Sequence, residues 1–155
     1  MIPKLTAVAA CQVARIDRDR FNEHVAGGRF PCAPETTPGR ARLFDPDDMI
    51  ALWLFRELMD DGLDASRAGK IACAVSGAAR RNPGAGAISY VQTYLEGGAG
   101  GGAYASEAIP APSEWDDLKF SGVEIRKVTT FRISKLRELI AEATEEQRSI
   151  IGPAD

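Results

Sequence analysis

Four side chains able to form hydrogen bonds with base edges or phosphates occupy every second position between residues 18 and 24: Arg18, Arg20, Asn22 and His24. On a helix, Arg18 and Asn22 lie on one face because they are four residues apart, and Arg20 and His24 lie on the neighbouring face. Arginine can donate two hydrogen bonds to guanine, and asparagine can pair with adenine in the same way. This pattern favours a helix that reads bases in the major groove of DNA.

The same segment has a second interpretation. Asp17 and Asp19 alternate with the arginines, would repel phosphates, and would balance Arg18 and Arg20 on an ordinary solvated surface. His24 is then one more surface residue. The sequence is compatible with both interpretations, because the same residue types occur on solvated helix faces and on binding faces.

Further cations surround this segment. Arg40 and Arg42 are two residues apart, so on a strand they would point to the same side and contact phosphate or enter the minor groove. Lys4, Arg15 and Arg29 are candidate contacts to the DNA backbone. Residues 1–44 hold seven lysines and arginines against four acids, whereas the whole chain has a net charge of -3. Such a basic segment is a weak sign of a face that binds a polyanion.

The elements that must position these side chains are visible in the pattern of caps and breaks. Residues 4–14 are rich in alanine and predict a short helix capped by Thr6. A break near Arg15 separates it from a second helix, 18–25, capped by Asp17. Gly27 and Gly28 end that helix. Two short helices separated by a few residues are typical of a helix-turn-helix.

Residues 29–44 contain three prolines and a glycine, which exclude a helix. Arg29-Phe30 and the segment 40–44 predict two short strands that flank a polar tip, a candidate β-wing. Asp45 and Pro46 then predict the start of a helix that Gly62 ends. Asp64 predicts the cap of another helix, 65–79.

Residues 4–77 resemble the DNA-binding domain of the MerR family of winged-helix regulators. The resemblance rests on Arg20-Phe21, on Gly39-Arg-Ala-Arg-Leu-Phe44, on Asp45-Pro-Asp-Asp-Met-Ile-Ala-Leu52, and on Phe55-Arg-Glu-Leu-Met-Asp-Asp-Gly-Leu63. It implies a sequence-specific regulator of transcription that binds double-stranded DNA with helix 18–25 in the major groove and the wing on the backbone or minor groove. Two alternatives share this fold: an excisionase-like or architectural DNA-binding protein, and a protein-interaction module.

The chain departs from this family after residue 82. Asn82-Pro83-Gly84 interrupts the long helix with which MerR regulators dimerise. Residues 88–95 and 123–133 predict strands on either side of a loop that includes the Gly-rich segment 97–103, and residues 134–148 predict a last helix. We expect an α+β chain with two parts: a winged helix-turn-helix over 1–82, and a strand-strand-helix region over 83–155 for dimerisation or sensing. A homodimer is expected, and RNA polymerase or another regulator is a further candidate partner.

The remaining composition argues against several other functions. Cys11, Cys32 and Cys73 lack the close spacing of metal ligands, so we expect three buried thiols, a reducing cytoplasm and no metal. There is no phosphate-binding Gly-Lys-Ser/Thr motif and no nucleophile with a base motif, so neither a cofactor nor an enzyme is expected. No apolar run approaches the roughly 18 residues of a membrane helix, so no membrane partner is expected.

Overall fold

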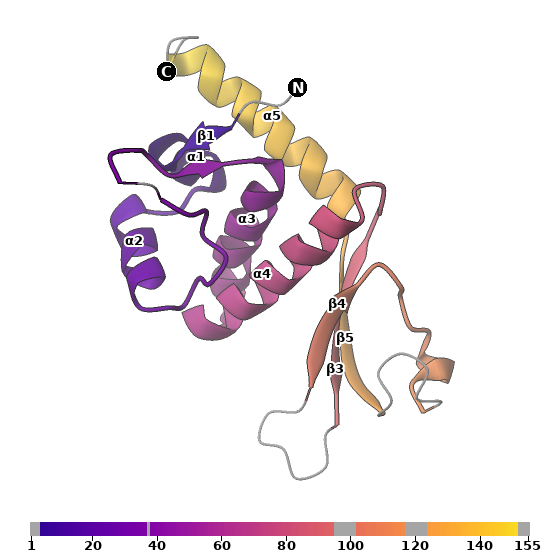
Figure 1. Cartoon of the computed structure of the whole chain (residues 1–155). Helices are drawn as coiled ribbons and strands as arrows, with labels where there is room; N and C mark the ends of the chain where they lie inside the picture. Colours follow the sequence, from indigo (N-terminus) through magenta and orange to yellow (C-terminus); the bar gives the residue numbers. More distant parts are fainter. Residues whose placement is uncertain (1–3, 37, 95–101, 117–123, 152–155) are drawn as a thin grey trace.

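A computed structural model describes residues 4–36, 38–94, 102–116 and 124–151. Over these residues the chain is mixed α+β, with five α-helices and two small antiparallel sheets. The helices gather in one part of the molecule, and the larger sheet extends away from them (Figure 1). The expected fold class is therefore confirmed at the level of α+β.

The first two helices begin at the predicted caps. Helix α1 spans Ala7–Ala14, and the Thr6 hydroxyl accepts a hydrogen bond from the Ala9 amide at 3.3 Å. Helix α2 spans Arg18–Ala26, and the Asp17 carboxylate accepts from the Arg20 amide at 3.0 Å. Each contact satisfies an amide that the first turn of a helix leaves without a partner.

The predicted strand pair of the wing is wrong. Strand β2 contains only Leu43–Phe44, and it pairs with β1, Leu5–Thr6, rather than with Arg29-Phe30. Residues 29 and 30 form a bend, and the Phe30 ring is buried against Phe21 at a centroid distance of 5.2 Å. Burial of this ring holds the segment against the helices, where it has no strand partner.

Helices α3, Pro46–Asp60, and α4, Ala65–Arg81, pack closely against each other. Helix α3 begins with a reciprocal cap: the Asp48 amide donates to Asp45 at 2.8 Å, and the Asp45 amide donates to Asp48 at 2.9 Å. Arg80 at the end of α4 reaches back to this cap, 2.7 Å from the Asp45 carboxylate. Asp64 caps α4 as predicted.

The C-terminal sheet has the strand order β4-β3-β5, and both pairings are antiparallel. Strands β3, Ile88–Thr93, and β5, Ile125–Phe131, lie in the two predicted strand segments. Strand β4, Ala103–Ser106, was not predicted, and its first residue belongs to the predicted Gly-rich segment 97–103. Residues 97–101 of that segment lie outside the described residues. A short 3₁₀ turn, Pro112–Glu114, follows β4.

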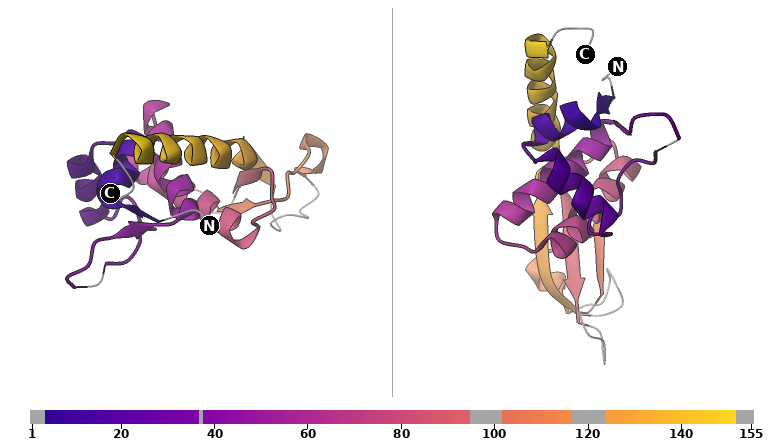
Figure 2. Two further views of the ribbon diagram at one scale, coloured as in Figure 1. Left: turned by 90° about the horizontal axis from the view of Figure 1, so that it is seen from above. Right: turned by 90° about the vertical axis from the view of Figure 1, so that its left-hand side faces the viewer.

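Helix α5, Ile133–Ile151, lies across the helical part of the molecule and packs against α1 and α3 (Figures 1 and 2). Ile133, Leu136 and Ile140 belong to the same buried cluster as the residues of α1, α3 and α4. An ion pair of 3.0 Å between Arg137 and Asp47 adds a polar contact. One core therefore extends across the expected boundary between residues 82 and 83.

The expectation of three free thiols is wrong for two of the cysteines. Cys32 and Cys73 form a disulfide with a Cα–Cα distance of 5.6 Å, and both residues are half-buried. Sequence spacing did not reveal it, because the two residues are 41 positions apart and meet only when α4 packs against the segment after α2. The disulfide also removes the observation on which the expectation of a reducing compartment depended. Cys11 is a buried free thiol as predicted, and burial raises its pKa to about 11.

Within the described ranges, no helix is long and apolar enough to cross a membrane.

Candidate nucleic-acid interface

Phe21 is the main attachment of helix α2 to the core, and the partly buried Val25 packs beside it. Phe21 is the only buried residue of this helix, and its ring lies 5.2 Å from that of Phe30 and 5.9 Å from that of Phe44. The side chains on the rest of the helix surface are mostly polar, and the exposed residues include Arg18, Asp19, Arg20, Asn22 and Glu23. The helix thus presents a polar surface from a position that a rigid aromatic cluster fixes.

The turn between α1 and α2 is tight. Arg15 adopts a left-handed conformation, φ 58° and ψ 43°, and the Ile16 amide donates to the Cys11 carbonyl at 3.0 Å. Left-handed backbone is unfavourable for a residue with a side chain. The conformation ends α1 abruptly and leaves the Arg15 side chain exposed beside the start of α2.

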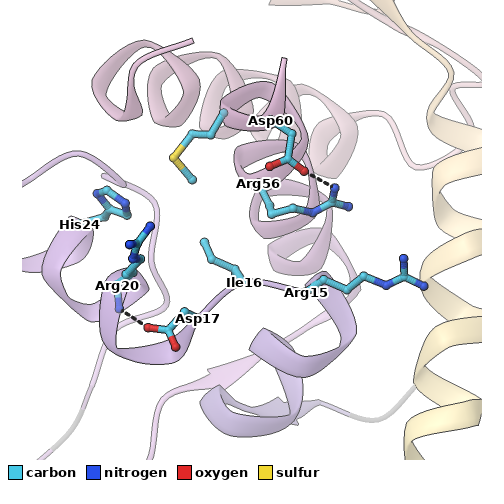
Figure 3. Close-up of a pocket in the computed structure, with 8 residues that line it drawn as sticks. Arg15, Ile16, Asp17, Arg20, His24, Arg56 and Asp60 are labelled. Atoms are coloured by element: carbon cyan, nitrogen blue, oxygen red, sulfur yellow. Dashed lines mark hydrogen bonds and ion pairs between the residues drawn. The ribbon is translucent and has the colours of Figure 1, made fainter. Parts of the chain in front are cut away.

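An open pocket of about 660 Å³ lies between α2, this turn and the C-terminal end of α3. Figure 3 shows Arg20 and His24 on α2 with Arg56 and Asp60 across from them, and Arg15 lines the edge of the pocket with its side chain extending away from α2. The structure thus brings together three of the predicted site residues, Arg15, Arg20 and His24. We call this region the α2–α3 pocket.

Arg56 is the residue of this pocket that sequence reasoning missed. Its Nε donates to the Ala14 carbonyl at 3.0 Å, and its guanidinium forms an ion pair with Asp60 at 2.8 Å. The first contact attaches the end of α1 to α3 and so fixes the turn before α2. In the sequence, Arg56 and Asp60 have the i,i+4 spacing of an ordinary surface ion pair, so nothing there indicated this role.

His24 enters the pocket as a neutral ring. Its Nδ1 accepts a hydrogen bond of 2.9 Å from Arg29, and its ring meets Phe55 edge-on at 5.3 Å. Partial burial and the neighbouring Arg29 charge lower the pKa of His24. Because Nδ1 is the acceptor, the proton of the neutral ring is assigned to Nε2, which can donate one hydrogen bond. Near pH 7, His24 can therefore donate a hydrogen bond but does not carry a positive charge.

Arg29 binds the C-terminal end of α2. Besides its bond to His24, its guanidinium donates to the Glu23 carbonyl at 3.0 Å. Cations near a helix C-terminus satisfy carbonyls that have no partner inside the helix. Arg29 was predicted as a backbone contact to DNA, and the structure shows that its guanidinium also holds the end of α2.

The remaining predicted residues are spread over the neighbouring loop and strand. Arg42 is half-buried and donates to the Pro34 carbonyl, so it joins the two arms of the loop between α2 and β2. Arg40 is exposed outside any strand, and the expectation that Arg40 and Arg42 share one side of a strand is wrong. Lys4 is exposed directly before β1, and the antiparallel pairing of Leu5 with Phe44 places it beside the start of α3 rather than beside that loop.

The disulfide and a glycine hold this loop against α4. A β-carbon on Gly69 of α4 would overlap the Arg29 carbonyl oxygen and would stand 2.9 Å from the carbonyl carbon. Cys73, one helical turn later, is bonded to Cys32 of the same loop. The position of the end of α2 thus depends on close packing of residues 29–32 against α4.

No protein-family model matches this chain, and no curated protein matches it. Among the described residues, no group of three or more histidine, cysteine, aspartate or glutamate side chains could hold a metal ion.

Proposed function

We propose that the chain is a regulator of transcription that binds duplex DNA sequence-specifically, with α2 as the reading helix. One observation carries the proposal: Phe21 fixes α2 on the core while Arg18, Arg20 and Asn22 are exposed along it. Arginine and asparagine on a firmly packed helix are suited to form hydrogen bonds with base edges. The MerR-like order of helix, turn, helix and loop supports the same proposal.

The roles of the other residues follow from their positions. Arg15 and Lys4 are exposed and would contact phosphates near the two ends of α1, and Arg40 would do so from the loop. Arg29, Arg42 and Arg56 would act indirectly, by holding α2, the loop and the turn. In this proposal the protein is a binding protein without catalytic activity, and its C-terminal region mediates self-association or signal input.

A second candidate function is a protein-interaction module. The observation that favours it is the mixed charge of α2, whose exposed residues include Asp19 and Glu23 beside Arg18 and Arg20. A surface with both signs of charge can complement a protein partner, whereas acids facing DNA repel phosphates. An excisionase-like or architectural role remains a variant of the first proposal, in which binding is less dependent on sequence.

Selection of bound duplexes from a random pool, by the full-length protein at about 150 mM salt, separates these functions. Two inverted halves in the enriched sequence support a dimeric specific regulator, and their spacing then defines the dimer geometry. Binding at low salt without enrichment supports the architectural role. Absence of DNA binding at any salt overturns the proposal and leaves the protein-interaction module.

A further inference from the structure

A second pocket, of about 290 Å³, lies between α4 and the C-terminal sheet. Three cationic side chains from two separate elements line it: Arg67 and Lys70 from α4, and Arg126 from β5. The lining contains no acidic residue. We call it the α4–sheet pocket, and it shares no lining residue with the α2–α3 pocket.

The position of Arg126 results from an irregularity of the sheet. Lys127 pairs with Gln92 and Ile125 pairs with Thr93, so Arg126 is the extra residue of a β-bulge. In a regular strand Arg126 would lie on the face opposite to that of Gln92 and Lys127. A bulge re-aims a side chain, and here Arg126 lines the pocket together with Gln92.

The floor of the pocket is partly apolar and firmly packed. Tyr90 is 4% exposed and Ile71 is 9% exposed, and both belong to the core, while Ala103 contributes a small side chain from β4. Burial raises the pKa of Tyr90, and the positive charge of Arg67 opposes this rise, so the phenol stays a neutral hydrogen-bond donor near pH 7. Donors and cations therefore surround a small space with a rigid floor.

The charges of this pocket are not balanced within the described chain. No carboxylate of the described residues forms an ion pair with Arg67, Lys70 or Arg126. Three like charges around one small space repel one another, although the protein as a whole carries a net charge of -3. An anion held between them would relieve this repulsion, and arginine forks match the geometry of carboxylate and phosphate oxygens.

We propose that the α4–sheet pocket binds a small polyanion, a molecule with at least two carboxylate or phosphate groups. The pocket volume is just below the roughly 300 Å³ at which the range typical of small-molecule sites begins, so the ligand must be small. The two sides of the pocket come from α4 and from the C-terminal sheet, so a bound anion joins the two parts of the chain. This inference does not depend on DNA binding by α2.

Isothermal titration calorimetry of the full chain tests the proposal with citrate and with pyrophosphate as probes. Sodium chloride at matched ionic strength serves as the reference for general screening. We expect saturable binding of at least one probe, and at least tenfold weaker binding for Arg126→Gln and for Arg67→Gln. The matched control is Arg81→Gln, which removes the same charge from the exposed end of α4 outside the pocket, and we expect its affinity to stay within twofold.

A second variant keeps the test decisive if a charge change disturbs the fold. Ala103→Leu leaves all three cations in place and fills the pocket, so we expect it to weaken binding at least tenfold. Circular dichroism and thermal unfolding check that each variant is folded. Probe binding that is absent, or equal in all folded variants, overturns the proposal. Loss of duplex DNA affinity in Arg67→Gln without any binding of the probes also overturns it, because the cations would then serve DNA phosphates.

Discussion

Gly69 of α4 lies directly against the main chain of Arg29, with no room for a β-carbon between them. The contact holds α4 against the segment that follows α2. Both sides of the contact are main chain, so no side chain could rotate to make room for an added β-carbon.

Gly69→Ala should therefore destabilise the protein, although alanine is the better helix former by up to about 1 kcal/mol. We expect a net loss of about 1–3 kcal/mol in the free energy of unfolding, because overpacking forces the loop from α4. Urea unfolding measures it. The control is Gly77→Ala in the same helix, where a β-carbon meets only the Arg81 side chain at 3.4 Å, and stability should rise or stay equal. An equal rise in the free energy of unfolding for both variants would show that the contact between Gly69 and Arg29 has room for a β-carbon.

Reduction of the Cys32–Cys73 disulfide should lower the melting temperature. Opening a crosslink that spans 41 residues costs about 4 kcal/mol through the entropy of the unfolded chain. For a chain of this size that corresponds to roughly 10 °C. Differential scanning calorimetry with and without a phosphine reductant measures the shift. The double variant Cys32→Ser/Cys73→Ser should melt like the reduced wild type and should not respond to the reductant, and a response there would assign the effect to another group.

Arg20 and His24 should differ in how they affect the salt dependence of DNA binding. Arg20→Gln removes a lasting positive charge, so the slope of log affinity against log salt should fall by about 0.9 if Arg20 neutralises one phosphate. His24→Gln should leave the slope unchanged near pH 7.5, because the lowered pKa of His24 keeps the ring neutral there. Fluorescence anisotropy with the selected duplex measures both slopes. A reduced slope for His24→Gln would show that the ring is charged in the complex.

The cap of α3 should make stability depend on pH in the acid range. Burial by itself would raise the pKa of Asp45. The hydrogen bonds from the Arg80 guanidinium and the Asp48 amide outweigh this effect and hold the pKa down to about 2. A depressed carboxyl pKa stabilises the fold above the unfolded value near 4, and this stabilisation is lost as the pH falls through 2. Asp45→Asn keeps a capping side chain but loses the charge, so the variant should be less stable at pH 6.

Thermal unfolding of wild type and Asp45→Asn between pH 6 and pH 2 measures this dependence. The two melting temperatures should converge as the pH approaches 2. A constant difference over the whole range would show that the charge of Asp45 does not contribute.

The features predicted well from the sequence depend on contacts between near neighbours. Thr6, Asp17, Asp45 and Asp64 were each predicted as helix caps, and each accepts a hydrogen bond from an amide three residues later. Such a cap needs no knowledge of the rest of the fold. For the same reason the helices begin within a few residues of the predicted positions.

The features that were missed depend on contacts between distant residues. The pairing of β1 with β2 joins Leu5 to Phe44, and strands of two residues have no periodicity that a sequence could reveal. The disulfide and the contact of Arg56 with Ala14 likewise appear only when helices meet. Strand β4 begins at the last residue of the segment 97–103, whose glycine-rich composition favoured a loop.

The candidate site shows the same division. The type and spacing of Arg18, Arg20 and Asn22 predicted an exposed polar helix face, and these residues are exposed. The sequence could not show which cations the fold itself uses. Arg29 and Arg42 carry the same charge as Arg20, but their guanidiniums bind main-chain carbonyls of Glu23 and Pro34.

The packing of α5 across α1 and α3 also bears on how the chain unfolds. Because Ile133, Leu136 and Ile140 belong to the same core as the N-terminal helices, we expect the two parts of the chain to unfold together in one transition. Gln147 near the end of α5 bonds Gln12 in α1, the helix that leads into α2. We therefore expect that a substitution of Gln147 weakens the support of α1 and, through the turn that follows α1, affects α2 as well.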